Sequence, residues 1–186
     1  MTRNRAAIFA AAALATLSAS ATFSGCAATR TAEADKDQLF KDVGVAIAEF
    51  KKADPGLELW FDHAYGYAVF PRVEKIGVGV GAAGGQGVVY DQGVSTGNSR
   101  MSQADLGLQL GGRSYREVIF FEDAATLADF TDGSFELAGN FAAYLAEEGA
   151  ASKATYQDGV AVFVMPTGGV MLDISVGGQS FDFAPW

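Results

Sequence analysis

The segment from Lys75 to Gly87, KIGVGVGAAGGQG, restricts the fold of this chain more than any other stretch. Gly79, Gly81 and Gly84 spell G-x-G-x-x-G, which in dinucleotide-binding proteins lies between a strand and a helix whose N-terminus holds the pyrophosphate. The residues that follow, GQGVVYDQG, have the pattern of a second strand and a turn. No helix follows to bind the phosphate, so we do not expect a nucleotide site.

A structural role explains these glycines better. Gly77, Gly79 and Gly81 alternate with Val78 and Val80, and alternate residues of a strand share a face. One face would then carry valines and the other no side chains, which permits close approach of another group and strong bending, as at a barrel corner. We predict five structural glycines: Gly77, Gly79, Gly81, Gly84 and Gly87.

The residues before this segment have a helical period. Leu39, Val43, Ile47 and Phe50 form one apolar stripe from about Asp35 onward, and Pro55-Gly56 ends it. GLELWFDHA indicates a short second helix. The stripe fits packing on the domain's own sheet, which we favour, or a helix on a membrane surface.

Most of the remaining chain has a period of two. YAVFP, GVVYD, ADLGLQLGG and REVIFFE are predicted strands, with a turn at Gln92-Gly93. DAATLADFTDG is a predicted helix, Ser134 to Ala154 is left open, and GVAVFVMP, GVMLDISVG and QSFDFAPW are predicted as three short strands. We therefore expect an α+β fold in which a curved, mainly antiparallel β-sheet, or a partly closed barrel, follows N-terminal helices.

The N-terminus has the pattern of an export signal. MTRNR is basic, the residues from Ala6 to Ala28 carry no charge, and FSGC resembles the lipobox of bacterial lipoproteins. Cys26 is the predicted lipidation site; the alternative is a buried or free thiol. We divide the chain into a signal peptide (1–25), a tether (26–34) and a domain (35–186). Ala27, in place of Asp, favours an outer membrane location facing the periplasm in cells that have one.

Composition narrows the function. The formal net charge is −9 and no cluster of basic residues is present, so we expect no nucleic-acid partner. With one histidine and one cysteine, the chain is a poor candidate for a zinc site. His63 follows Asp62, but adjacent side chains point apart, so they do not form a catalytic pair. We expect no cofactor, no metal and no enzyme activity.

The glycine segment is part of a longer resemblance. The chain is similar to the SYLF domain family in HAYGYAVFPRVEKIGVGVGAAGGQGVVYDQG, in DLGLQLGGRSYREVIFFEDAATLADFTDGSFELAG and, more weakly, in GGVMLDISVGG. The resemblance runs from about Leu39 to the C-terminus. It implies a non-catalytic domain that binds membrane phospholipid, on an exported and often lipid-anchored protein in bacteria.

The resemblance also implies where head groups would bind. The matching basic residues are Lys51, Lys52, Arg72 and Lys75, and the alternative for each is an ordinary solvated cation. The net negative charge opposes anionic lipid unless these residues form a local patch. A second possible function is an envelope module that binds a protein or a glycan without binding lipid.

Overall fold

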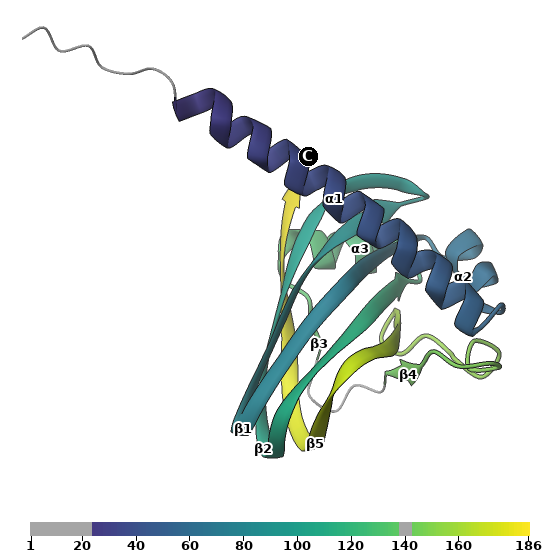
Figure 1. Ribbon diagram of the computed structural model, residues 1–186. Coiled ribbons are helices and arrows are strands. Elements are labelled where there is room, and N and C mark those ends of the chain that lie inside the picture. Colours follow the sequence, from purple (N-terminus) through teal and green to yellow (C-terminus); the bar gives the residue numbers. More distant parts are fainter. Residues whose placement is uncertain (1–23, 138–142) are drawn as a thin grey trace, which may run out of the picture.

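The computed structural model describes residues 24–137 and 143–186 (Figure 1). Helices α1 (Ser24–Ala53) and α2 (Leu57–His63) come first, followed by β1 (Gly66–Asp91), β2 (Val94–Phe121), α3 (Ala124–Asp132), β3 (Glu136–Leu137), β4 (Tyr144–Leu145) and β5 (Val160–Pro185). The sheet has the order β1-β2-β5-β3, and β4 pairs in parallel with β5 while every other pair is antiparallel. The expected curved, mainly antiparallel α+β fold is confirmed at this level.

The three long strands double back on themselves. Each has 26 or 28 residues, and a straight strand of 26 residues would be about 85 Å long. Instead, the two ends of β1 lie together, since Gln92 N donates to Tyr65 O at 3.0 Å and the rings of Tyr67 and Tyr90 stack 4.8 Å apart. Figure 1 shows the middles of β1, β2 and β5 gathered at the lower end of the molecule, which we call the fold-back end.

The doubled strands form the two walls of a half-barrel. The first wall comprises residues 66–78, 110–121 and the start of β5, and the second comprises 80–91, 94–106 and the end of β5. The walls meet along β1, where glycines allow close approach: a Cβ added at Gly87 would lie 2.5 Å from Val69 O, and one at Gly85 would lie 2.6 Å from Arg72 O.

The strand boundaries expected from sequence are wrong. GVAVFVMP, GVMLDISVG and QSFDFAPW are one continuous strand, β5, and the predicted strands from YAVFP to REVIFFE merge into β1 and β2. Glycine bends a strand without interrupting its pairing to the neighbours, as at Gly77, which pairs with Gly111. Gly and Pro therefore mark bends here instead of strand ends.

Two hydrophobic cores lie on opposite faces of the sheet. One fills the half-barrel, where Phe121, Phe130 and Phe181 come together under α3. The other lies between the outer face and the helices, where Val43 and Phe50 of α1 are fully buried and Leu39 and Ile47 are half-buried. The apolar stripe of the first helix therefore packs on the domain's own sheet.

The helices α2 and α3 form where the sequence predicts them. Asp123 caps α3 by accepting a hydrogen bond from Thr126 N, and Gly133 ends it with a φ of 82°. The predicted turn at Gln92-Gly93 is present, with both residues at positive φ. In the stretch from Ser134 to Ala154, which the sequence left open, the described residues form only the two short strands β3 and β4.

The residues expected to form a tether, 26–34, are helical and belong to α1, which begins at Ser24. Alanine has the highest helix propensity, and four of these nine residues are alanines with no glycine or proline among them. The predicted signal peptide lies almost entirely outside the described residues. No helix in the described part of the chain is both long and apolar enough to span a membrane.

Candidate functional site

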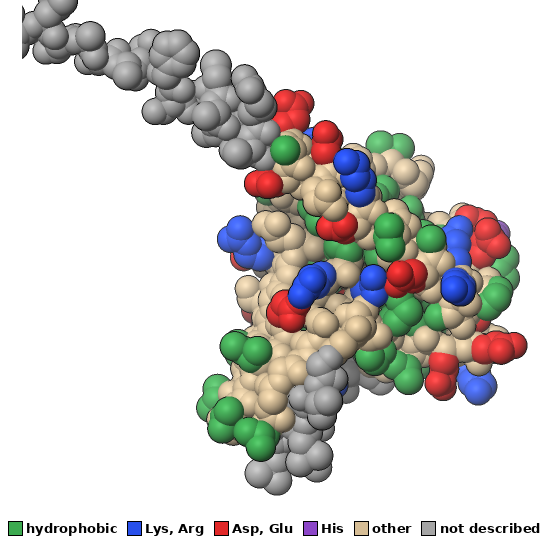
Figure 2. Space-filling view, in the orientation of Figure 1, with side chains coloured by type: hydrophobic (Ala, Val, Ile, Leu, Met, Phe, Trp, Pro, Cys, Tyr) green, Lys and Arg blue, Asp and Glu red, His purple; other side chains and the backbone are tan. Residues whose placement is uncertain are grey.

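The fold-back end exposes a group of aliphatic side chains. These residues, which we call the apolar end, are between 64 and 77 % exposed: Ile76, Val78, Val80, Leu106 and Leu110. Pairing between β1 and β2 brings them together, because Val78 lies opposite Leu110 and Val80 lies opposite Leu106. In Figure 2 hydrophobic side chains gather at the lower left of the molecule, whereas charged side chains lie over its upper part and its right side.

A shallow hollow lies within the apolar end. It has a volume of about 530 Å³, and its lining consists only of aliphatic residues and glycines: Ile76, Gly77, Val78, Val80, Gly81, Ala82, Leu110 and Gly111. No lining residue carries a charge. Clustered aliphatic side chains exposed to water are typical of surfaces that contact an apolar partner.

Gly79 shapes this surface in an unexpected way. It has a φ of 76°, and the register between β1 and β2 shifts at this point. Despite this irregularity Val78 and Val80 both lie exposed, as the predicted valine face requires, whereas Gly77 is half-buried and Gly81 is buried. A Cβ at Gly79 would meet no atom within 4 Å; the described glycines of the 75–87 segment that another group approaches closely are Gly85 and Gly87.

The other predicted structural glycines have different surroundings. Gly81 is buried and Gly77 is half-buried, both beside the hollow. A Cβ at Gly84 would make an ordinary contact, 3.5 Å from Met101 O. The geometry thus supports a close-packing role for Gly87 and a conformational role for Gly79. It supports neither role for Gly84.

The four basic candidates do not act as one patch. Lys75 is wrong as a head-group contact, because it is 3 % exposed and its Nζ lies 3.0 Å from Asp105 Oδ2 inside the half-barrel. Arg72 is exposed and paired with Glu74, while Lys51 lies 3.6 Å from Glu58. Lys52 is exposed near the end of α1. Paired acids cancel much of the charge that these residues would offer to an anionic lipid.

The interior near the fold-back end holds a polar cluster that sequence reasoning missed. Three contacts cross from the first wall to the second. Besides the Lys75–Asp105 pair, Tyr115 Oη donates to Gln103 Oε1 at 3.2 Å, and Gln179 Nε2 donates to Glu117 Oε2 at 3.1 Å. Gln103 Nε2 also donates to Asp105 Oδ1 at 2.8 Å, and Gln179 Nε2 reaches Gln103 Oε1 at 3.1 Å, so the contacts form one network.

Glu117 is the unusual member of this cluster. It is 1 % exposed, and its Oε1 has no hydrogen-bond partner. Burial raises the pKa of the Glu117 carboxyl to about 7, against a smaller lowering by the hydrogen bond from Gln179. Burial, and then the charge of Glu117, also raise the pKa of Tyr115 above its ordinary value. Alternation in the sequence could have indicated that Glu117 is buried. Its neighbours on the core face lie at intervals of two residues: Tyr115, Ile119 and Phe121.

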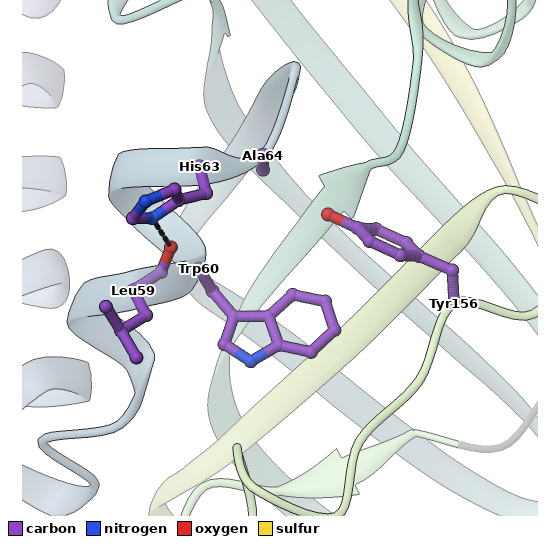
Figure 3. A pocket seen from close by; sticks show the side chains of 5 residues that line it. All are labelled: Leu59, Trp60, His63, Ala64 and Tyr156. Atoms are coloured by element: carbon purple, nitrogen blue, oxygen red, sulfur yellow. Dashed lines mark hydrogen bonds between the residues drawn. The ribbon is translucent and has the colours of Figure 1, made fainter.

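A second hollow lies beside α2 (Figure 3). Its volume is about 410 Å³, and its lining residues are Leu59, Trp60, His63, Ala64 and Tyr156. The indole N–H of Trp60 donates to Ala151 O at 3.2 Å, and His63 Nδ1 donates to Leu59 O at 2.9 Å. These polar atoms are used within the protein, and the hollow is mainly an apolar surface with rings of Trp60 and Tyr156 5.0 Å apart.

Asp62 and His63, the pair considered in the sequence, both lie in α2. His63 forms its hydrogen bond within α2 and not with Asp62. No three His, Cys, Asp or Glu side chains gather as a metal site in the described part of the chain. Cys26 lies in the first turn of α1, next to the start of the described residues.

The chain is similar to a curated bacterial protein. No family model matches the chain. The chain is 30 % identical over 139 residues to a protein of Aeromonas veronii named Beta cell expansion factor A. The match covers 73 % of this chain and 52 % of that protein, so the chain spans about half the length of the curated relative it matches. The name of the relative specifies neither a reaction nor a ligand.

Proposed function

We propose that this domain binds membrane lipid, without catalysing a reaction, through the apolar end of its half-barrel. The observation that carries the proposal is the group of five exposed aliphatic side chains at the fold-back end, around a hollow with no charged lining residue. The resemblance to the lipid-binding SYLF family supports the same class of ligand.

The composition of the apolar end favours the hydrocarbon region of a bilayer as its partner. Full burial of a Val, Leu or Ile side chain contributes about 1.5–3 kcal/mol, so five partly exposed side chains offer several kcal/mol in total. At about 25 cal/mol per Å² this corresponds to at most several hundred Å². A stable protein interface needs about 800 Å² on each partner, which makes the patch small for a dimer contact.

Electrostatic attraction to lipid head groups should contribute less to binding than the four basic residues suggested in the sequence. The chain has a net charge of −9, Lys75 is buried, and Lys51 and Arg72 pair with carboxylates. Head-group charge should therefore have little effect on binding. An apolar contact also predicts that salt does not weaken binding, because salt screens charges and leaves hydrophobic burial intact.

Lipidation would complement this contact. We propose that Cys26 is acylated after export and that the protein is held at the membrane, the outer membrane in cells that have two. A contact made by the domain itself would add to attachment through the acyl chains and fix how the half-barrel approaches the bilayer.

Vesicle flotation tests the proposal directly. The chain from Ala27 to Trp186 keeps nearly all of α1 and lacks both the signal and Cys26. We expect it to float with uncharged phosphatidylcholine vesicles, to a similar extent at low and high salt. Val78→Asp and Leu110→Asp should each reduce the bound fraction at least tenfold, because they place a charge where hydrocarbon contact is expected.

Val94→Asp is the matched control. Val94 is also an exposed valine, at 68 %, but it begins β2 directly after the Gln92-Gly93 turn, where the two ends of β1 lie together, away from the fold-back end. The control variant should bind vesicles as well as the unchanged protein. Failure of the unchanged domain to float with neutral and anionic vesicles alike would exclude lipid binding and favour the alternative, an envelope module for a protein or glycan.

A further inference from the structure

The polar cluster inside the half-barrel joins the two walls beside the apolar end. Its three cross-wall contacts link β1 to β2, β2 to itself and β2 to β5: Lys75 to Asp105, Tyr115 to Gln103, and Glu117 to Gln179. Two of its members directly precede residues of the apolar end, since Lys75 is followed by Ile76 and Asp105 by Leu106.

We infer that Glu117 is a proton-controlled latch: its neutral form holds the two walls together at the fold-back end, and its ionised form loosens them. Because the fold-back end carries the proposed lipid contact, this inference rests on the proposed function where it concerns membranes. The loosening itself is a property of the protein alone.

The surroundings of Glu117 favour its neutral form. Among the described residues it makes no ion pair: the nearby cation Lys75 lies against Asp105, and Arg113 lies over the ring of Tyr115, 5.7 Å from its centroid. The remaining polar groups of the cluster are the amides of Gln103 and Gln179 and the hydroxyl of Tyr115. Ionisation of Glu117 would thus add a second negative charge to a buried cluster that contains one paired Asp and one paired Lys.

The hydrogen bonds around Glu117 agree with a change between a closed state, with a neutral carboxyl, and a looser state, with an ionised one. Glu117 Oε1 and Gln179 Oε1 both lack a partner. A neutral carboxyl has an O–H that can donate to the amide oxygen of Gln179 after a rotation of that amide, whereas two bare oxygens cannot satisfy each other. In the ionised form, water must reach the carboxylate, and water enters only if the walls separate.

Hydrogen exchange of the full chain carrying Cys26→Ser, without lipid, tests the latch. After correction for intrinsic exchange, amide protection in 72–81 and 100–112 should fall at least tenfold between pH 5.5 and 8.5. Protection in α3 should change much less. Glu117→Gln should remove this pH dependence, whereas Glu74→Gln, which alters an exposed glutamate in β1, should leave it unchanged.

A second variant covers the case in which Glu117→Gln does not fold. Glu117→Leu replaces the carboxyl with an apolar side chain of similar size, and it too should show protection that is independent of pH. A flat pH profile in the unchanged protein, or the same pH dependence in Glu117→Gln or Glu117→Leu, would overturn the inference.

The test separates this inference from the lipid proposal. Flotation of the chain from Ala27 to Trp186 with phosphatidylcholine vesicles at the two pH values gives the second readout. A pH-dependent latch without flotation at either pH would retain the inference about Glu117 and refute lipid binding. Flotation together with amide exchange that does not change with pH would refute the inference about Glu117 and retain lipid binding.

Discussion

Gly87→Ala tests whether the half-barrel depends on close contact between the two halves of β1. A methyl group at this position would lie 2.5 Å from Val69 O and 2.7 and 3.0 Å from two atoms of the Phe70 ring. Both neighbours are fully buried, so the backbone of one wall must move. Overpacking of this kind costs about 1–3 kcal/mol.

Gly84→Ala is the matched control in the same strand. Its Cβ would lie 3.5 Å from Met101 O, an ordinary contact distance. Replacement of glycine by alanine without strain stabilises by about 0.4–1 kcal/mol through the unfolded state. We therefore expect Gly84→Ala to be neutral or slightly stabilising, and Gly87→Ala to lower the free energy of unfolding by about 2 kcal/mol.

Urea denaturation followed by tryptophan fluorescence measures this difference. A loss of about 2 kcal/mol corresponds to a decrease in Tm of about 4–8 °C for a domain of this size. Gly79→Ala provides a third comparison, because its expected cost of about 1–2 kcal/mol comes from positive φ and not from crowding. Equal stabilities of Gly84→Ala and Gly87→Ala would refute the close approach of the two walls along β1.

Four further predictions concern stability and anchoring. Phe50→Ala, in the core beneath α1, should cost about 3–5 kcal/mol in urea denaturation, and a loss below 1 kcal/mol would contradict the packing of α1 on the sheet. Burial raises the pKa of Asp54, but hydrogen bonds from Ala151 N and Gly56 N outweigh burial and lower it overall. The stability that Asp54 contributes should therefore be lost as the pH falls below about 3.8, and Asp54→Asn should reduce this loss of unfolding free energy at acid pH. Glu117 has a folded pKa of about 7, raised from 4.5, so its contribution to stability is complete below pH 4.5 and is lost as the pH rises through 7. The free energy of unfolding should fall by about 3 kcal/mol over this range and stay constant in Glu117→Gln. Cys26→Ser should abolish incorporation of labelled acyl chains and weaken membrane attachment to that of the domain alone, and persistent labelling would refute lipidation at this residue.

Local patterns in the sequence were sufficient for the fold class, for α2 and α3 and for the end of α1, but they placed the start of α1 at about Asp35 and not at Ser24. The Leu39, Val43, Ile47 and Phe50 stripe and the Pro55-Gly56 stop define α1 and its end, and Asp123 and Gly133 bracket α3. Alternation over most of the remaining chain indicates a sheet. These features depend on residues close in sequence, and local propensity and period describe them well.

The doubling of the strands depends on distant residues and was not predictable from local patterns. Glycine can end, bulge or bend a strand, and only the pairing of Gly77 with Gly111 distinguishes these cases. The burial of Lys75 could not be predicted for the same reason, because its partner Asp105 approaches it from the opposite wall. The apolar end appeared in the sequence as Val78 and Val80, which alternation placed on one face, but Leu106 and Leu110 join them only through the pairing of β1 with β2.

The most direct measurement of the central claim is the depth of the apolar end in a bilayer. In a chain from Ala27 to Trp186 no cysteine remains, so Val78→Cys can be labelled with the fluorophore NBD at one position. With phosphatidylcholine vesicles we predict a blue-shifted, brighter emission at Val78→Cys that nitroxides on the acyl chains quench, while the same label at Val94→Cys keeps its emission in water. Binding to vesicles with an unchanged, water-like emission at Val78→Cys would contradict insertion of the apolar end.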